Sequence, residues 1–127
     1  MLFRNILLID DDEDDQEIFL TALENIRLPV NCTVSDNARD ALDKLVAGEI
    51  SPELIILDLN MPVMNGQQFL MEVKKEKNLK NIPVIVLSTS SHELTIALTK
   101  ELGASQFISK PERFEDLISQ LRKILGE

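Results

Sequence analysis

The stretch ELIILD, residues 53–58, joins four consecutive apolar residues to an aspartate. A strand with one solvated face alternates apolar and polar residues, whereas a parallel strand covered on both faces stays apolar throughout. The runs at 5–10 and 83–88 have the same unbroken apolar character, and two further strand-length runs lie at 30–35 and 106–109. These five runs predict a sheet that is largely parallel.

Each of these runs is followed by a segment in which apolar residues recur at helical spacing. The recurring positions are Ile18, Phe19, Ala22, Leu23 and Ile26, then Ala38, Ala41, Leu42 and Leu45, then Phe69, Leu70 and Val73, then Leu94, Ala97, Leu98 and Leu102, and finally Phe114, Leu117, Ile118, Leu121 and Leu125. Five strand and helix pairs with right-handed crossovers predict an α/β fold, a three-layer doubly wound sheet. Such folds bind ligands at the carboxyl ends of the strands, where the strand order reverses.

The length and charge of the chain narrow its class. A sequence of 127 residues has the size of one domain, and we expect residues 1–127 to form it. The net charge is −9, but seven of the 22 acidic residues lie within residues 10–17, so the excess of negative charge is local. Such an acidic site makes nucleic acid a poor partner.

Cysteine content and apolar runs indicate where the protein acts. The single cysteine, Cys32, cannot form an internal disulfide, which is typical of a reducing compartment. No apolar run in the sequence approaches the roughly 18 residues that a membrane-spanning helix needs. The N-terminal stretch LFRNILLI meets acidic residues before any small-residue cleavage site. We therefore expect a cytoplasmic protein without a membrane segment.

Polar residues stand at the ends of four predicted strands, namely Asp10 and Asp11, Asp58, Ser88 and Lys110. Singly, each has a structural explanation, such as a helix cap or a solvated charge. At one edge of a sheet, however, converging carboxylates repel one another and favour a hard cation such as Mg²⁺, which binds carboxylates, water and phosphate oxygens. An aspartate beside such a cation can attack a phosphoryl group to form an acyl phosphate, and Asp58 is the candidate nucleophile.

Four motifs, IDD at 9–11, LDLNMPVMNG at 57–66, VLSTS at 86–90 and FISKP at 107–111, follow one another in a familiar order and spacing. With them the chain resembles the receiver domains of bacterial two-component response regulators, and in particular stand-alone, chemotaxis-regulator-like members. The resemblance covers the whole chain. It implies a flavodoxin-like fold with five helices and a five-stranded parallel sheet in the order 2-1-3-4-5.

The resemblance also implies a role for each residue of the site. Asp58 is then the phosphoacceptor, Asp11 and Asp58 are direct ligands of Mg²⁺, and Asp10 acts mainly through water. Asn60 lends its backbone carbonyl to the metal, and Lys110 pairs with the phosphoryl oxygens.

Two positions match the family's response to phosphorylation. Ser88 stands where threonine is commoner and keeps the hydroxyl that bonds the new phosphoryl group. Phe107 keeps the ring that turns inward but lacks a phenolic hydroxyl for a partner. The resemblance places the read-out on the face built from the fourth helix, the fifth strand and the last helix, with Ile96 and Lys100 as candidate contacts.

The remaining sequence features are interpreted as structural rather than as part of the site. Gly66 matches the glycine that follows the nucleophile's loop, and the bond between Lys110 and Pro111 matches a cis peptide of the family. Residues 12–15 fit a helix start, and His92 fits an exposed bystander rather than a phosphotransfer site. The basic residues that fit a solvated helix end are Lys74, Lys75, Lys77 and Lys80.

A single-domain response regulator accepts a phosphoryl group from a sensor histidine kinase or a histidine phosphotransfer protein. Phosphorylation then switches its binding to a downstream protein, which the sequence does not name, in phosphorelay signal transduction. The resemblance therefore implies a switch rather than an enzyme with a separate substrate. We expect it to phosphorylate itself from small donors and to lose the phosphoryl group slowly.

Two other classes of protein share part of this pattern. Haloacid-dehalogenase-type phosphohydrolases also use an aspartate nucleophile and Mg²⁺, but they need a second aspartate two residues later, where this chain has Asn60. Flavodoxin-like FMN modules share the fold, yet their first loop must cradle phosphate, which the acidic residues 10–15 repel. The glycine-rich phosphate-binding motifs of nucleotide-binding proteins are absent from the sequence.

Overall fold

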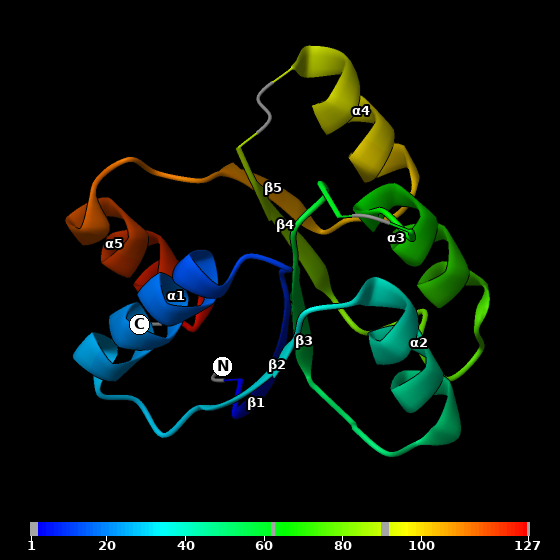
Figure 1. The fold of residues 1–127 in the computed structure, drawn as a ribbon, viewed down its shortest axis with the longest axis horizontal. Coiled ribbons are helices and arrows are strands. Elements are labelled where there is room, and N and C mark those ends of the chain that lie inside the picture. The colour runs from blue at the N-terminus through cyan, green and yellow to red at the C-terminus, as the bar shows by residue number, and fades with distance from the viewer. Residues whose placement is uncertain (1–2, 62, 90–91, 127) are drawn as a thin grey trace.

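The computed structural model describes residues 3–61, 63–89 and 92–126, in which strands and helices alternate along the chain (Figure 1). The strands are β1 (Asn5–Ile9), β2 (Asn31–Ser35), β3 (Leu54–Leu57), β4 (Val84–Ser88) and β5 (Gln106–Ser109). The helices are α1 (Glu13–Ile26), α2 (Ala38–Ala47), α3 (Gly66–Lys75), α4 (Glu93–Glu101) and α5 (Phe114–Ile124). Each strand is followed by one helix, as the sequence predicts.

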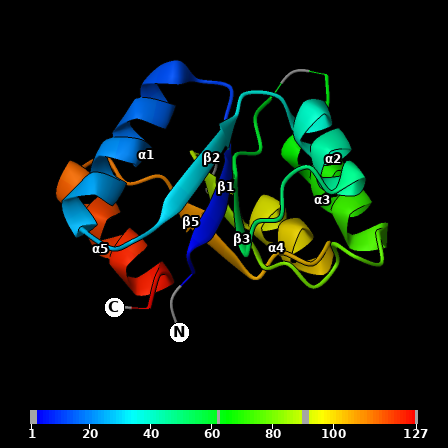
Figure 2. The same ribbon diagram turned by 90° about the horizontal axis from the view of Figure 1, so that it is seen from below.

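The strands form one parallel sheet in the order β2-β1-β3-β4-β5. Helices α1 and α5 lie together on one face, and α2, α3 and α4 cover the other, so the molecule has three layers (Figures 1 and 2). This is the doubly wound, flavodoxin-like α/β fold that the sequence predicts. Because β2 and β3 lie on opposite sides of β1, the switch point lies at the carboxyl ends of β1 and β3.

Side chains of the central strands alternate between two separate cores. In β1, Ile6 and Leu8 pack under α1 and α5, whereas Leu7 and Ile9 pack under α2 and α3. All residues of β1 from Ile6 onward, and all of β3, are at most 2% exposed. A parallel strand with two buried faces must be apolar at every position, which is the origin of the unbroken runs in the sequence.

The acidic run after β1 starts a helix. The side chain of Asp12 caps α1 by accepting the backbone N–H groups of Asp14 at 2.9 Å and Asp15 at 3.2 Å. The first turn of α1 is acidic, at Glu13, Asp14 and Asp15, and lies at the positive end of the helix dipole. The helix-start role predicted for residues 12–15 is thus confirmed, although Asp15 also has a second role.

Apolar residues recur at helical spacing along α4 and just after it, at Leu94, Ala97, Leu98 and Leu102. Burial follows this pattern at Leu102, which packs against the core under α2 and α3, but not within the helix. In the structure Leu94 is 86% exposed and Leu98 is 44% exposed, and the buried residue of this helix is Thr99. The Thr99 hydroxyl donates to the carbonyl of Ile96 at 2.9 Å, so its burial leaves no polar group unsatisfied. The helix predicted from the apolar spacing is thus present, but the residue that it buries is a satisfied threonine rather than an apolar one.

The basic run at the end of α3 is only partly a solvated helix end. The ammonium of Lys74 donates to the carbonyls of Lys80 at 3.0 Å and Ile82 at 3.3 Å. Burial lowers the pKa of Lys74. Its stem passes Gly103, where an added Cβ would lie 3.0 Å from Lys74 Cε. Lys74 therefore ties the end of α3 to the chain that enters β4.

Among the described residues, no helix combines the length and apolarity that crossing a membrane requires.

Candidate functional site

Four strands bring polar side chains to one edge of the sheet. Asp10 follows β1, Asp58 follows β3, Ser88 ends β4 and Lys110 follows β5. Asp10, Asp58 and Ser88 are buried. The backbone N–H of Lys110 donates to the Ser88 carbonyl at 2.8 Å and joins the ends of β4 and β5. The residues that were predicted to converge do lie at one edge.

Asp10 is held from several directions. Its backbone N–H donates to the carbonyl of Ser35 at 3.0 Å, and its own carbonyl accepts the Gln16 side chain at 2.6 Å. Its Oδ1 accepts the N–H of Asp12 at 3.0 Å, and its Oδ2 accepts the ammonium of Lys110 at 3.0 Å. Both carboxylate oxygens of Asp10 therefore accept hydrogen bonds, which fixes the orientation of its side chain.

Asp58 lies at the start of a tightly packed loop. The N–H of Gly66 donates to the carbonyl of Leu59 at 3.0 Å. A Cβ on Gly66 would lie 2.7 Å from both the Asp58 carbonyl oxygen and Leu59 Cα, so only glycine fits without displacing backbone. Helix α3 then begins with reciprocal hydrogen bonds between Asn65 and Gln68, each 2.9 Å long. This packing fixes the loop that presents the Asp58 carboxylate.

Val63 introduces strain into the same loop. Its φ of +67° is in the left-handed region, which β-branched residues rarely adopt, and its side chain is 92% exposed. The left-handed conformation costs a residue with a Cβ roughly 1–2 kcal/mol. The loop next to Asp58 is therefore held in a shape that Val63 does not favour.

The ionisation of Asp58 reflects opposing effects. The pKa of Asp58 is raised to about 6, chiefly by burial; the Lys110 charge opposes this shift and the Asp10 charge adds to it. Backbone hydrogen bonds from Asn60 and Leu59 also lower it. The carboxylate is thus ionised at neutral pH but sits close to its pKa, so a small change of environment alters its proton occupancy.

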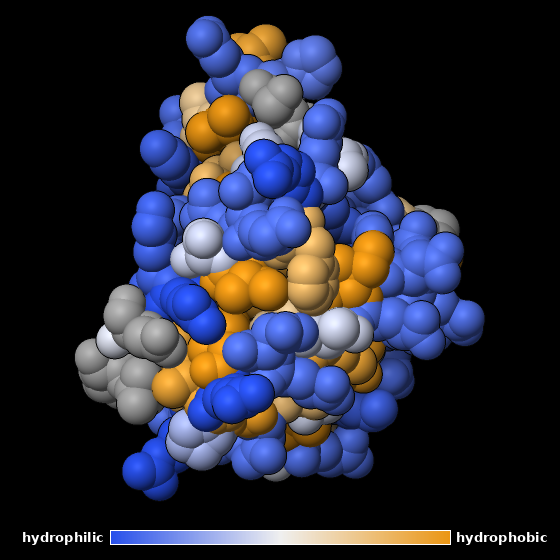
Figure 3. Space-filling model, turned by 90° about the vertical axis from the view of Figure 1, so that its left-hand side faces the viewer, coloured by the Kyte–Doolittle hydropathy of each residue, from blue (hydrophilic) through white to orange (hydrophobic). Residues whose placement is uncertain are grey.

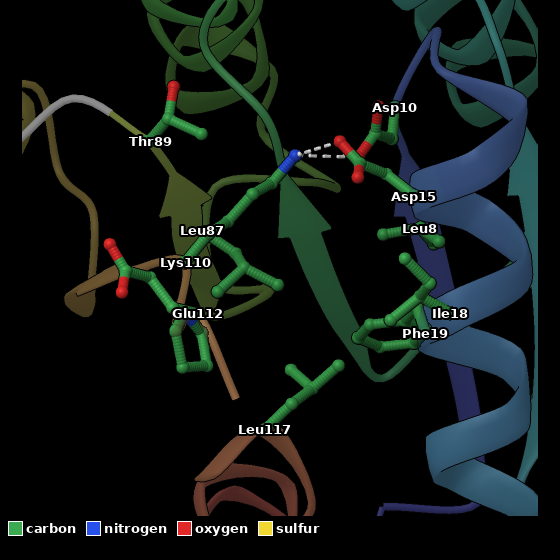
Figure 4. A pocket seen from close by; sticks show the side chains of 11 residues that line it. Leu8, Asp10, Asp15, Ile18, Phe19, Leu87, Thr89, Lys110, Glu112 and Leu117 are labelled. Carbon is green, nitrogen blue, oxygen red and sulfur yellow. Dashed lines mark hydrogen bonds and ion pairs between the residues drawn. The ribbon is translucent and has the colours of Figure 1, made fainter. Parts of the chain in front are cut away.

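The ammonium of Lys110 lies among three carboxylates. Its Nζ is 2.8 Å from Asp15 Oδ2 and 3.0 Å from Asp10 Oδ2 (Figure 4). Asp58 Oδ1 lies further away, at 3.9 Å. Burial alone would lower the pKa of Lys110, but its bonds to Asp15 and Asp10 and the Asp58 charge outweigh burial and raise it. Lys110 therefore remains a cation beside Asp58.

Asp15 is the site residue that the sequence analysis missed. Its place in the first turn of α1 already has a local explanation, and its partner Lys110 is 95 residues away in the chain. One signal was available, since Asp15 follows Asp11 by four residues, about one turn of helix. That spacing predicts proximity to the acidic pair but not to Lys110.

Asp10, Asp11 and Asp58 form a cluster of carboxylates that fits a metal ion. One oxygen from each lies within 4.8 Å of the others. At 4.8 Å, two such charges repel by about 3.5 kcal/mol with an effective dielectric near 20. His92 precedes α4 and Cys32 lies in β2, so neither belongs to the cluster, and its ligands are oxygens alone. Such a set favours a hard divalent cation.

The other predicted site residues lie outside this cluster. Asn60 is exposed in the loop two residues after Asp58. Phe107 is half-buried in β5 and packs against the core under α2 and α3. The bond between Lys110 and Pro111 is trans, so the cis bond implied by the resemblance is wrong for this structure. Trans is also the form that a bond before proline ordinarily favours.

A pocket opens beside Lys110, between α1 and the segment that joins β5 to α5 (Figure 4). Its lining includes Asp15, Ile18, Leu87, Thr89, Pro111 and Leu117. On the side of the molecule that carries α1 and α5, apolar surface is visible between polar side chains (Figure 3). The Lys110 side of the site is therefore open to molecules at the surface.

The family model for the response regulator receiver domain matches residues 6–122. This chain belongs to the response regulator receiver family. The resemblance found in the sequence is thus confirmed, and the matching family is neither a haloacid-dehalogenase-type hydrolase nor an FMN-binding flavodoxin. Receiver domains are components of two-component signalling.

Relatives and solved structures agree with this assignment. The two-component response regulator ORR11 of rice is 32% identical over 121 residues, which are 95% of this chain and 80% of that protein. Response regulator Rcp1 of Synechocystis sp. is 31% identical over 124 residues, covering 94% of this chain and 84% of Rcp1.

Two receiver crystal structures describe forms that bear on the site. The Mn²⁺-bound form of Rcp1 superposes with a TM-score of 0.85 at 28% identity, covering 95% of this chain and 91% of that chain. The phosphorylated cyanobacterial phytochrome response regulator RcpA superposes with a TM-score of 0.87 at 32% identity, covering 95% and 90% of the two chains. One of these receivers thus holds a divalent metal and the other a phosphoryl group.

Proposed function

We propose that Asp58 is the phosphoacceptor of this receiver, in a reaction that depends on Mg²⁺. The observation that carries the proposal is the position of the buried Asp58 carboxylate. One of its oxygens lies within 4.8 Å of oxygens of Asp10 and Asp11, and Asp58 Oδ1 lies 3.9 Å from the Lys110 ammonium. A nucleophile, a set of metal ligands and a fixed cation therefore share one edge of the sheet.

In the proposed reaction an Asp58 carboxylate oxygen attacks the phosphorus of a phosphohistidine. The new oxygen–phosphorus bond forms while the bond between phosphorus and the donor's imidazole nitrogen breaks, and that electron pair returns to the imidazole as it leaves. Lys110 neutralises charge on the phosphoryl oxygens. The Ser88 hydroxyl bonds the phosphoryl group after transfer, as in the family pattern.

The carboxylates of Asp11 and Asp58 are the proposed direct ligands of Mg²⁺, with Asp10 acting through water and Asn60 through its backbone carbonyl. When bound, Mg²⁺ supplies positive charge that offsets the negative charge of the phosphoryl oxygens and of the clustered carboxylates. The oxygen-only ligand set and the Mn²⁺-bound structure of Rcp1 support a divalent metal at this place.

The proposed donor is a sensor histidine kinase or a histidine phosphotransfer protein, and the proposed output is altered binding of a downstream protein. Phosphorylation adds nearly two negative charges beside Ser88 and Lys110. Lys110 bonds the Ser88 carbonyl through its backbone, and Phe107 pairs with Val86 in the adjacent strand. These links favour a read-out at α4, β5 and α5, with Ile96 and Lys100 as candidate contacts.

We also propose that residues 1–127 act as one receiver domain, since one sheet and the match at 6–122 extend over most of this range. In this proposal the protein is a switch with self-phosphorylation and slow self-dephosphorylation rather than an enzyme with a separate substrate. The net charge of −9 disfavours nucleic acid as a partner, and a single cysteine suits the cytoplasm.

The decisive experiment is intact-mass analysis after incubation with acetyl phosphate and Mg²⁺. We expect one added phosphoryl group on the wild type, none on Asp58→Asn, and little on the wild type in the presence of EDTA. Asp36→Asn, an exposed aspartate outside the site, is the matched control and should be phosphorylated like the wild type. An adduct that persists on Asp58→Asn would overturn the assignment of Asp58.

A further inference from the structure

Asp15 makes the shortest contact of the Lys110 ammonium. The distance from Lys110 Nζ to Asp15 Oδ2 is 2.8 Å, compared with 3.9 Å to Asp58 Oδ1. Figure 4 shows the Lys110 side chain reaching from the end of β5 to carboxylates that come from the start of α1 and the end of β1. The cation next to the phosphoacceptor is thus held by residues other than the phosphoacceptor.

The helix does not require the Asp15 carboxylate for its cap. In a capping box, the acidic residue at the third helical position reaches back to the N–H of the capping residue. Here the N–H of the capping residue, Asp12, already donates to Asp10 Oδ1 at 3.0 Å. Asp12 in turn caps the N–H groups of Asp14 and Asp15. The Asp15 side chain is therefore available for Lys110.

The contact between Asp15 and Lys110 lies where water screens it only partly. The Lys110 side chain is 17% exposed and the Asp15 side chain is 38% exposed, so the pair lies at the rim of the site with one cation largely out of water. An ammonium has three N–H donors on a flexible four-carbon stem. Asp15 and Asp10 engage two of the donors of Lys110, which leaves one for an oxygen at Asp58.

We propose that Asp15 is a positioning residue for phosphoryl transfer, because it anchors Lys110 at the distance from Asp58 where its remaining donor serves the phosphoryl oxygens. This inference rests on the proposed role of Asp58. Asp15 also balances part of the Lys110 charge. A divalent cation at Asp10, Asp11 and Asp58 repels the ammonium, and the Asp15 carboxylate keeps the ammonium in place.

The kinetic test is a double-mutant cycle with acetyl phosphate and Mg²⁺, in which the rate of phosphorylation is followed by intact mass. We expect Asp15→Ala to slow phosphorylation about tenfold, as removal of a charged hydrogen bond to a positioned group does. Asp15→Asn keeps an oxygen that accepts from Lys110 but loses the charge, so it should recover only part of the rate. Asp14→Ala, an exposed acid in the same helical turn, should match the wild type.

The same changes in a Lys110→Met background distinguish positioning from a general effect of charge or stability. If Asp15 acts through Lys110, Asp15→Ala has no further effect once the ammonium is gone. An equal slowing in both backgrounds, or equal rates for Asp15→Ala and the wild type, would overturn the inference.

A spectroscopic test does not depend on phosphorylation. In protein labelled with ¹⁵N-lysine, we expect the Lys110 ammonium signal to be protected from exchange with water in the wild type and in Asp14→Ala. In Asp15→Ala the signal should move toward that of solvated lysines and exchange faster. An unchanged Lys110 signal in Asp15→Ala would show that Asp15 does not anchor the ammonium. A wild type that takes up no phosphoryl group would instead contradict the proposed function.

Discussion

A Cβ placed on Gly66 would lie 2.7 Å from the carbonyl oxygen of Asp58, and so the first residue of α3 packs closely against the backbone of the proposed phosphoacceptor. We expect Gly66→Ala to lower the free energy of unfolding by about 2–3 kcal/mol and to slow phosphorylation, because backbone must move to admit the methyl group. Urea denaturation and intact-mass kinetics measure the two effects.

Gly48→Ala is the matched control for that change. Gly48 has a φ of +76°, and a Cβ there meets nothing within 4 Å. It should lose about 1–2 kcal/mol from backbone strain alone and keep the wild-type rate of phosphorylation. If Gly66→Ala also kept the wild-type rate, the contact would not position Asp58.

The raised pKa of Asp58 predicts a stability difference that depends on pH. The pKa is about 6 in the folded protein against the ordinary value of 3.8, so the folded state binds this proton more tightly. Binding of this proton contributes about 3 kcal/mol to the free energy of unfolding. The contribution is fully present below about pH 4 and is lost as the pH rises through 6. Metal-free Asp58→Asn should therefore be about 2–3 kcal/mol more stable than the wild type at pH 7.

Denaturation of both proteins in EDTA across this pH range measures the difference. The advantage of Asp58→Asn should shrink toward zero near pH 4, where the wild-type residue is also neutral. A difference in unfolding free energy that stays constant from pH 4 to 7 would mean that the variant acts through packing rather than charge.

We expect Asp11 to destabilise the metal-free fold and to be required for binding of Mg²⁺. In the metal-free protein its charge is repelled by Asp10 and Asp58, so Asp11→Ala should preserve or raise the melting temperature without Mg²⁺. Mg²⁺ at about ten times its dissociation constant should add about 1.4 kcal/mol to the wild type and much less to this variant. Asp14→Ala should keep the wild-type response. Equal responses in the wild type and Asp11→Ala would show that Asp11 does not bind the metal.

Val63 offers a stabilising substitution in the loop after Asp58. Asparagine tolerates the left-handed conformation better than valine, so Val63→Asn should raise the free energy of unfolding by about 1 kcal/mol. Val46→Asn, at an exposed position of α2, should change it by a few tenths at most, since the two residues have similar helix propensities. Chemical denaturation decides, and equal effects at the two positions would exclude backbone strain as the cause.

The sequence predicted the central sheet well because a strand that is buried on both faces has an unbroken run of apolar residues. β1, β3 and β4 are apolar at nearly every position, and the residues that follow β1 and β3 are acidic in a strongly apolar context. Any residue at the carboxyl end of a parallel strand shares an edge with the others, so the convergence of Asp10 and Asp58 followed from the order of elements.

Two features could not be predicted for physical reasons. The inner face of α4 is centred on Thr99, and apolar periodicity cannot reveal a threonine whose hydroxyl is satisfied by its own helix. The contact between Asp15 and Lys110 joins two residues that each have a complete local explanation, one as a helix-start acid and the other as a strand-end base. They meet because the parallel sheet brings the segment after β5 and the start of α1 to the same edge.

The alternation of β1 side chains between two cores limits how the protein can change during evolution. A single-residue insertion within β1 would exchange Ile6 and Leu8 with Leu7 and Ile9, and the two cores would receive side chains of the wrong shape at the same time. It would also shift Asp10 away from the edge where Lys110 meets it. Insertions and deletions should therefore accumulate in the connections at the opposite end of the sheet, such as 48–53, where a change of length leaves the chemistry undisturbed.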